Sequence, residues 1–292
     1  MKVDVQNLVV RHGDVTAVDD LSFSLAENKV YGLLGRNGAG KSSLMSVLAA
    51  FRRPTSGTVL VDGEPVFENR RATSRICLVQ HGVDPADKGD RLKDALSLAA
   101  ALRENWDAEY AERLMELFGL PHGTKLGQLS LGQRSAFGVV VGLASRAPLT
   151  MFDESHIGMD TPTRYAFYDA LLSDFMTSPR TVVLSTHLIE ELASLLEEVV
   201  IIDSGRLVLH EETEAVRSRG TSVTGPIGAV DRFVEGLTVL NQKQLGPTKS
   251  AMVYGALDQA HHATARTEGL DLGPVPLQDL FVHLTEPAGE PR

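Results

Sequence analysis

The chain has 292 residues, 43% hydrophobic and 23% charged, a composition typical of a folded protein with one full domain and a smaller one. Its net charge of -10 disfavours a nucleic-acid-binding protein, because such proteins need concentrated positive charge. The single cysteine, Cys77, cannot form an internal disulfide, and no apolar stretch has the length of a membrane span or signal peptide. We therefore expect a reduced cytosolic protein that reaches a membrane only through a partner chain.

Strand-like and helix-like segments alternate along the chain, which predicts a parallel sheet flanked by helices. Between residues 90 and 118 the pattern changes to helices alone, and this predicts an inserted helical subdomain over about 82–148. Its leucines at 92, 96, 98, 102, 114 and 117, with Phe118, have a spacing suited to one buried face. We expect strands at 30–34, 58–61, 75–79, 149–153, 181–185 and 199–203, and helices at 41–51, 163–175 and 188–196.

The last part of the chain has a different character. Residues 204–205 predict a hairpin to a strand at 206–210, followed by a helix at 211–219. The Gly-, Ser- and Thr-rich stretch 220–228 predicts a linker. Beyond it we expect a small mixed α/β extension with strands at 237–240 and 251–254, a helix at 256–263, an amphipathic segment at 277–284 and a loose end at 287–292. The predicted domains are therefore 1–219 and 220–292.

Residues 35–42 read Gly-Arg-Asn-Gly-Ala-Gly-Lys-Ser, a complete G-x-x-x-x-G-K-[ST] phosphate-binding loop. It follows an apolar strand and opens a helix, which is the context that the motif requires. Gly35, Gly38 and Gly40 leave room for backbone N–H groups to approach phosphate, since no Cβ stands in the way. Lys41 is suited to the β- and γ-phosphate oxygens, and the hydroxyl of Ser42 to Mg²⁺. The sequence therefore predicts a nucleotide site.

Further polar residues follow at the ends of predicted strands. Asp153 and Glu154 close an apolar strand, and an acid at that place holds Mg²⁺ while the next one activates water. Gln80 and His187 close two other strands, where they can face the γ-phosphate side of the loop. Ser130 and Gly132 lie just before an apolar helix whose N-terminus is suited to an anion.

This ordered set resembles the ATP-binding cassette ATPases, and the resemblance covers roughly residues 1–218. It implies a P-loop NTPase sheet core with an N-terminal antiparallel β subdomain, the inserted helical subdomain and a small α+β C-terminal extension. It makes Glu154 and His187 catalytic, and assigns Mg²⁺ to Ser42, Gln80 and Asp153. The implied ATP-binding residues are His12, Gly35, Asn37, Gly38, Ala39, Gly40, Lys41, Ser42, Ser43, Gln80, Ser130, Gly132, Gln133 and Asp160.

The resemblance also implies how the chain works. Cassettes of this family bind ATP between two subunits arranged head to tail, so Ser130 and Gly132 would contact nucleotide held by the other subunit. The chain is similar to separate ATPase subunits of bacterial antibiotic and multidrug exporters. We expect a second ATPase subunit, homologous or identical, a separately encoded polytopic membrane protein, and a location at the cytoplasmic face of the membrane.

The chain departs from the family pattern at three places. Leu131 replaces the first glycine of the usual Leu-Ser-Gly-Gly-Gln signature, which leaves the backbone N–H but adds a side chain. Ser155-His156 stands where Pro-Thr is usual, and His156 is interpreted as a plain loop residue. His12 occupies the position of the aromatic residue that stacks on adenine in this family. The alternative interpretation of His12 is a solvated histidine in a turn.

Two other functions fit parts of the pattern. A soluble cassette ATPase of translation or DNA maintenance typically has two cassettes or long coiled coils, whereas this chain has one cassette, no sustained heptads and an acidic charge balance. A small-molecule kinase would share the phosphate loop but needs an acceptor site in place of a second cassette. The signature at Ser130, with Glu154 and His187, disfavours the kinase.

Overall fold

The computed structural model describes residues 1–80 and 89–285. The chain forms two compact units, one made of Met1–His187 and Leu195–His210 and the other of Leu188–Ser194 and Glu211–Arg292. Among the described residues, no helix combines the length and the apolar character that crossing a membrane requires. The predicted boundary at 219/220 stays a prediction, and the predicted loose end falls outside the described residues.

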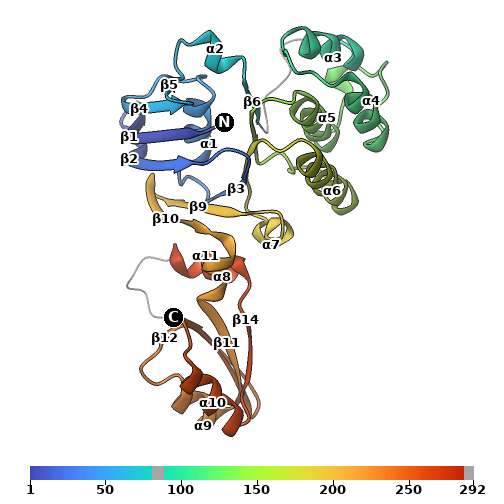
Figure 1. Cartoon of the computed structure of the whole chain (residues 1–292). Helices are drawn as coiled ribbons and strands as arrows, with labels where there is room; N and C mark the ends of the chain where they lie inside the picture. Colours follow the sequence, from blue (N-terminus) through green and yellow to red (C-terminus); the bar gives the residue numbers. More distant parts are fainter. Residues whose placement is uncertain (81–88, 286–292) are drawn as a thin grey trace. The chain divides into compact units, whose positions relative to one another are not determined.

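The first unit is built on a six-stranded sheet (Figure 1). Strands β3, β7 and β8 are buried along their whole length, which explains why each reads as a mostly apolar run. The pairs among β3, β6, β7, β8 and β9 are parallel, and the register places Gln80, Asp153 and Ser185 side by side at one edge. The strand order is β10 (Arg206–Glu212), β9 (Glu198–Asp203), β3 (Val30–Leu34), β8 (Thr181–Ser185), β7 (Leu149–Asp153) and β6 (Ile76–Gln80).

An antiparallel sheet precedes and flanks this core, as expected from the resemblance. Its apolar face and helix α1 (Lys41–Leu48) share one hydrophobic cluster with the six-stranded sheet, to which Leu8, Leu21 and Met45 contribute fully buried side chains. The strand order is β2 (Val15–Leu25), β1 (Val3–His12), β4 (Ser56–Val61) and β5 (Glu64–Pro65), and the short helix α2 (Arg70–Thr73) follows.

The helical subdomain contains α3 (Leu92–Ala101), α4 (Ala108–Leu117), a 3₁₀ turn at Leu126–Gln128 and α5 (Leu131–Ala144). The predicted single buried face is wrong for three of its leucines. Leu98, Leu102 and Leu117 are more than half exposed, whereas Leu92, Leu96 and Leu114 are buried. For Leu98 the reason is the helical period, because a residue two positions after the buried Leu96 points away from the buried face. The predicted start of the subdomain at residue 82 lies outside the described residues.

The helices that follow β7 and β8 differ in length from the predicted ones. Helix α6 (Thr161–Thr177) follows β7, and its length exceeds the predicted 163–175 by two residues at each end. The predicted helix at 188–196 is shorter in the structure, since α7 covers only Ile189–Leu192 and belongs to the second unit.

The second unit holds a four-stranded antiparallel sheet with its own core around Val223, Val230 and Val253. The predicted linker at 220–228 is wrong, because β11 lies inside this sheet between β13 and β14. Its glycines serve packing: a Cβ at Gly225 would lie 2.5 Å from Leu270. The elements are α8 (Thr213–Ser218), β11 (Gly220–Pro226), α9 (Ile227–Phe233), β12 (Thr238–Leu245), β13 (Thr248–Tyr254), α10 (Gln259–Thr267), β14 (Asp271–Pro274) and α11 (Leu277–Leu284).

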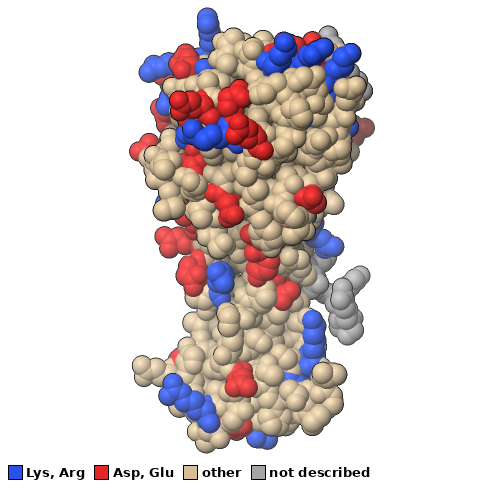
Figure 2. All heavy atoms as spheres, turned by 90° about the vertical axis from the view of Figure 1, so that its right-hand side faces the viewer, with Lys and Arg blue, Asp and Glu red and all other residues tan. Residues whose placement is uncertain are grey.

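Charged side chains of both signs are interspersed on the face drawn in Figure 2, and most of that face is uncharged. On the described residues of this face there is no continuous basic surface of the kind that follows a nucleic-acid backbone.

Candidate nucleotide-binding and hydrolysis site

The phosphate loop joins β3 to α1, as the sequence predicts. Gly38 and Gly40 have φ angles of 83° and 105°, a backbone conformation that side-chain-bearing residues rarely adopt. At Gly40 a Cβ would also lie 2.2 Å from the carbonyl oxygen of Ala17 on β2. Two constraints therefore require glycine at residue 40, where α1 begins and its first N–H groups are free to face an anion.

Lys41 lies inside the loop. Its Nζ donates to the carbonyl oxygen of Gly35 at 2.7 Å and to that of Arg36 at 3.4 Å, and the side chain is only 7% exposed. The ammonium also lies 3.8 Å from Oε1 of Glu154. A buried charge needs such partners, and these three contacts hold Lys41 at the place where phosphate oxygens would be received.

The predicted adenine-stacking residue lies beside the loop. His12 ends β1, and its Nε2 lies 2.9 Å from the hydroxyl of Ser43 on α1. This contact brings the imidazole to the nucleotide side of the antiparallel sheet. Its stacking role stays a prediction.

The strand-end residues Gln80 and Asp153 are neighbours across β6 and β7. The side-chain amide of Gln80 donates to Ser46 Oγ at 3.3 Å, and Ser46 in turn donates to the carbonyl oxygen of Ser42 at 2.7 Å. Asp153 is 5% exposed, and its Oδ1 has no hydrogen-bond partner among the described residues. A buried carboxylate oxygen without a donor is suited to a cation, so this edge fits Mg²⁺.

Glu154 follows Asp153 with an unusual backbone, φ 52°, which is uncommon for a residue with a side chain. Its N–H donates to the carbonyl oxygen of Ser185 at 3.1 Å, and this fixes the turn at the end of β7. The carboxylate is 15% exposed and receives a 2.7 Å hydrogen bond from Nδ1 of His187. The strained backbone thus aims the carboxylate toward the phosphate loop.

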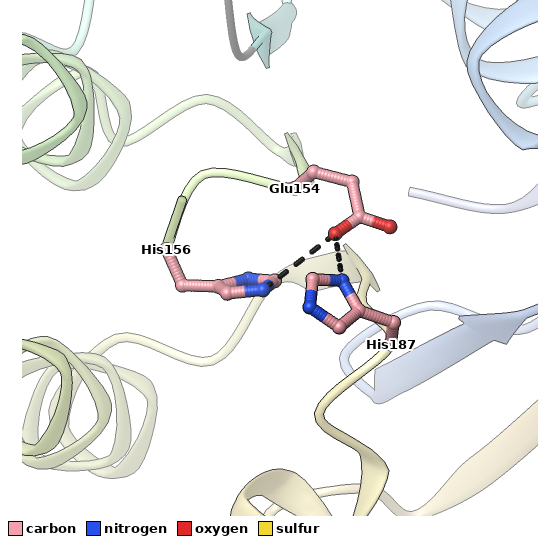
Figure 3. Close-up of side chains that lie close together, drawn as sticks. All are labelled: Glu154, His156 and His187. Atoms are coloured by element: carbon pink, nitrogen blue, oxygen red, sulfur yellow. Dashed lines mark hydrogen bonds and ion pairs between the residues drawn. The ribbon is translucent and has the colours of Figure 1, made fainter. Parts of the chain in front are cut away.

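His156 also reaches Glu154, and the sequence interpretation missed this contact. Its Nε2 lies 3.6 Å from Glu154 Oε2, and its ring packs on that of His187 with 4.9 Å between centroids. Figure 3 shows both imidazoles directed at the same carboxylate oxygen. His156 is 5% exposed, so it is a buried part of the site and not a plain loop residue. The only feature of the sequence that could have indicated a role for His156 is the replacement of the usual Pro-Thr by Ser155-His156 after the acid pair.

Most of the predicted residues line one hollow of about 510 Å³, a volume suited to a nucleotide phosphate chain. Ala17 and Ile157 also line it, and nothing in their residue types could have identified them from sequence. The predicted residues that line it are Asn37, Gly38, Ala39, Gly40, Lys41, Ser42, Ser43, Glu154 and His187.

The signature residues lie at the N-terminus of α5. Ser130 caps this helix in a reciprocal pair with Gln133: the N–H of Gln133 donates to Ser130 Oγ at 3.2 Å, and that of Ser130 to Gln133 Oε1 at 2.9 Å. A Cβ at Gly132 would lie 2.3 Å from the carbonyl oxygen of Gly158, so the helix start packs against the loop after β7. Leu131 is 43% exposed beside them.

Asp160 caps α6, and the N–H of Thr163 donates to its Oδ1 at 3.0 Å. Hydrogen bonds from the side chain and backbone of Thr163 lower the pKa of this carboxyl. Asp160 does not line the phosphate-loop hollow. The signature residues Ser130, Gly132 and Gln133 do not line it either.

A phosphate loop after β3 of a parallel sheet, with an acid pair at the end of β7, one strand removed from β3, defines a P-loop ATPase cassette. A family model described as ABC transporter matches residues 18–156. A Nod factor export ATP-binding protein I from Burkholderia orbicola is 30% identical over 213 residues, which are 70% of this chain and 69% of the relative. The chain belongs to the ABC transporter ATP-binding family, and it is an ATPase of that family that binds ATP.

Two other relatives differ in how much of this chain they match. A doxorubicin resistance ATP-binding protein, DrrA, from Mycobacterium tuberculosis is 28% identical over 281 residues, covering 94% of this chain and 81% of the relative. A methionine import ATP-binding protein, MetN, from Bradyrhizobium diazoefficiens is 31% identical over 204 residues, covering 66% of this chain and 59% of the relative.

Solved structures confirm the predicted fold class. The ATP-binding subunit of an ABC transporter superposes with a TM-score of 0.66 at 19% identity, over 74% of this chain and 92% of that one. At this identity the likeness concerns the fold alone.

Proposed function

We propose that this chain is the ATP-hydrolysing subunit of an exporter, that it dimerises around two ATP molecules, and that it drives a separate membrane-spanning partner. The observation that carries the proposal is the position of Glu154: its carboxylate is held by His187 on one side and faces Lys41 of the phosphate loop on the other. An acid fixed at this distance from the phosphate loop is suited to activating water at a γ-phosphate.

Phosphate binding rests on the loop and on Lys41. The ammonium is held by carbonyl oxygens of its own loop, so it is in place before ATP arrives and little reorganisation is needed. The free N–H groups at the start of α1 add the positive end of a helix dipole to the same hollow. His12 supplies a flat ring for the adenine.

Ser42, Gln80 and Asp153 are the residues we assign to Mg²⁺. The donor set is oxygen only, which is what Mg²⁺ prefers, and the buried Asp153 Oδ1 lacks another partner among the described residues. When bound, the ion neutralises charge that develops on the phosphate oxygens.

In the hydrolysis step Glu154 accepts a proton from the attacking water. The hydrogen bond from His187 Nδ1 fixes the carboxylate's orientation, which reduces the entropy lost on reaching the reactive geometry. The surrounding burial keeps bulk water from competing for the same oxygen atoms.

The signature residues are assigned to the ATP held by a second subunit. Ser130, Gly132 and Gln133 stand at the N-terminus of a 14-residue helix, where an anion is favoured by the helix dipole. They are not among the residues that line the hollow of their own chain. A head-to-tail pair, in which Asp160 takes part, would bring one subunit's signature to the other's phosphates.

The exporter assignment rests on the doxorubicin resistance relative and the Nod factor export relative, and the match with the former includes the C-terminal part of this chain. The doxorubicin resistance relative matches 94% of this chain, whereas the methionine import relative matches 66%, so the C-terminal part is shared with the former. This is consistent with an ATPase domain at 1–219 and a C-terminal extension at 220–292. All the relatives described are named for resistance, export or import, which disfavours a soluble cassette ATPase of translation or DNA maintenance.

Purification of the tagged chain from its native host in mild detergent tests the proposal. A polytopic membrane protein recovered in near-equal amount would support it and would place the chain at the cytoplasmic face of the membrane. Recovery of the chain alone, or with ribosomes or nucleic acid, would overturn the transporter assignment.

A further inference from the structure

We propose that Glu154, His156 and His187 form a binding site for a divalent transition-metal ion of the zinc type, which the chain holds when no nucleotide is bound. The three side chains come from the end of β7, the loop after it and the end of β8 (Figure 3). Each offers one ligand atom, and the three atoms lie within 4.8 Å of one another.

The spacing of the donors is close to what such an ion requires. Glu154 Oε2 lies 2.7 Å from His187 Nδ1 and 3.6 Å from His156 Nε2. Ligand atoms about 2.0–2.1 Å from a tetrahedral zinc ion lie about 3.3 Å from one another. These two distances fall on both sides of that value, and they would change by about 0.6 Å and about 0.3 Å to reach it.

The donor set determines the kind of metal. Two imidazole nitrogens and one carboxylate oxygen form the His₂Glu combination that zinc sites use, and they leave a fourth position for water. Mg²⁺ prefers oxygen ligands and is served by the different set assigned to it above. The two ions would therefore not compete for the same donors.

His156 supplies the third ligand atom, without which Glu154 and His187 would form only a hydrogen-bonded pair. Its ring is buried and is fixed against the ring of His187, so little side-chain entropy remains to be lost on binding. His187 is half exposed, with 53% of its side chain accessible, and this gives a metal ion a path from solvent. Binding requires Nδ1 of His187 to lose its proton, which the accessible ring can carry on Nε2 instead.

A metal ion at this place would act on hydrolysis. It would occupy Glu154 Oε2, the oxygen that His187 now holds, and would reduce the ability of the carboxylate to accept a proton. The site would therefore keep the ATPase silent until the ion is removed. Zinc binding by the chain without nucleotide does not depend on the proposed function, so failure of one leaves the other standing.

The test measures Zn²⁺ binding by the full-length chain, free of nucleotide and Mg²⁺, in competition with a chromophoric chelator. We expect one ion per chain. In His156→Gln the apparent Kd should rise at least about tenfold, since changes in the partners of metal ligands alone cause losses of that size. His122→Gln is the matched control, because its Nε2 forms a 2.8 Å contact with Glu112 on the surface and it belongs to no three-residue metal-ligand group among the described residues.

Thermal unfolding without metal shows whether each variant is folded, and His187→Gln replaces His156→Gln in the binding measurement if the latter is not.

A second measurement concerns hydrolysis. Micromolar Zn²⁺ should inhibit the ATPase of the parent chain, excess chelator should restore it, and His156→Gln should resist inhibition. Less than one ion per parent chain, or equal affinities in His156→Gln and His122→Gln, would overturn the metal site.

Discussion

Lys41 and Glu154 face each other across the phosphate-loop hollow, with 3.8 Å between Nζ and Oε1. Both side chains are largely buried, 7% and 15% exposed, so their opposite charges stabilise one another without nucleotide. Phosphate oxygens of ATP would compete for the ammonium and release the carboxylate toward water. The pair thus links nucleotide binding to the availability of the base.

Glu154→Gln should leave ATP binding intact and slow hydrolysis by at least about 100-fold, the size of effect that a general base supplies. The amide has nearly the same shape but cannot accept the proton of water. Steady-state phosphate release and gel filtration with ATP measure the two effects, and we expect the variant to accumulate as a nucleotide-bound dimer.

Glu116→Gln provides the control for Glu154→Gln, since Glu116 is exposed on α4. It should behave as the parent chain does. Unchanged phosphate release in Glu154→Gln would exclude Glu154 as the base.

Lys41→Ala should weaken ATP binding itself. The change removes charge-assisted hydrogen bonds worth about 1.5–3 kcal/mol, or roughly a tenfold to 150-fold rise in Kd. Titration with a fluorescent ATP analogue measures this, and Lys93→Ala on the exposed side of α3 is the matched control. An ATP affinity equal to that of the parent chain would contradict the assignment of the phosphate loop.

The sequence predicted most of the sheet core because its strands are buried on both faces. The strands 149–153 and 181–185 were predicted with the boundaries that the structure shows, since each is a short, mostly apolar segment. The phosphate loop and the acid pair were found because their residue types follow from phosphate and metal chemistry at fixed spacing.

Other parts could not be predicted because they depend on packing between distant segments. Gly220 and Gly225 suggest a flexible linker, but they accommodate Leu280 and Leu270 across the small sheet. His156 has no fixed spacing to His187, which lies 31 residues later, and only the folded chain brings their rings together. The exposed Leu98 was misassigned because leucine alone does not define a helix face.

Gly132→Ala should lower both stability and hydrolysis. Its Cβ would lie 2.3 Å from the carbonyl oxygen of Gly158, and backbone cannot move aside as a flexible side chain can. We expect a loss of about 1–3 kcal/mol in the free energy of unfolding, the usual cost of overpacking. Urea unfolding measures it, with Gly123→Ala as control, because among the described residues a Cβ there meets nothing nearer than 3.9 Å. Equal losses in the two variants would contradict the close approach.

Asp107 makes stability depend on acid pH. A hydrogen bond from the N–H of Tyr110 lowers the pKa of this carboxyl, and Arg146 adds to the effect against the opposing influence of burial. Since the folded-state pKa lies below the unfolded value of about 3.9, the stabilisation is present above that pH and is lost as pH falls through the folded value. The stability contributed by Asp107 is therefore lost at pH values below about 4.

Asp107→Asn retains a helix-capping side chain but cannot titrate. Urea unfolding between pH 6 and 2.5 should show a shallower loss of stability in this variant than in the parent chain. Asp94→Asn on the exposed face of α3 should keep the parent chain's slope. Parallel curves for the parent and Asp107→Asn would show that Asp107 does not contribute to the acid sensitivity.

Asp174→Asn should be the most destabilising of these changes. The carboxylate is 1% exposed and receives hydrogen bonds from Arg146 and from Arg180, the latter at 2.5 Å. Arg180 is itself only 5% exposed, so loss of the acid leaves a buried guanidinium without its carboxylate partner. Breaking a buried pair in this way costs about 3–5 kcal/mol.

The free energy of unfolding at neutral pH measures this loss, and Asp169→Asn on the exposed side of the same helix is the control. Through Arg146 and Arg180, Asp174 joins the end of α5 and the residues that lead into β8 to α6, close to the paired strands that lead to Glu154 and His187. Hydrolysis by Asp174→Asn should therefore fall at temperatures below its unfolding midpoint. An Asp174→Asn chain as stable and as active as Asp169→Asn would show that this pair is not needed to hold the site.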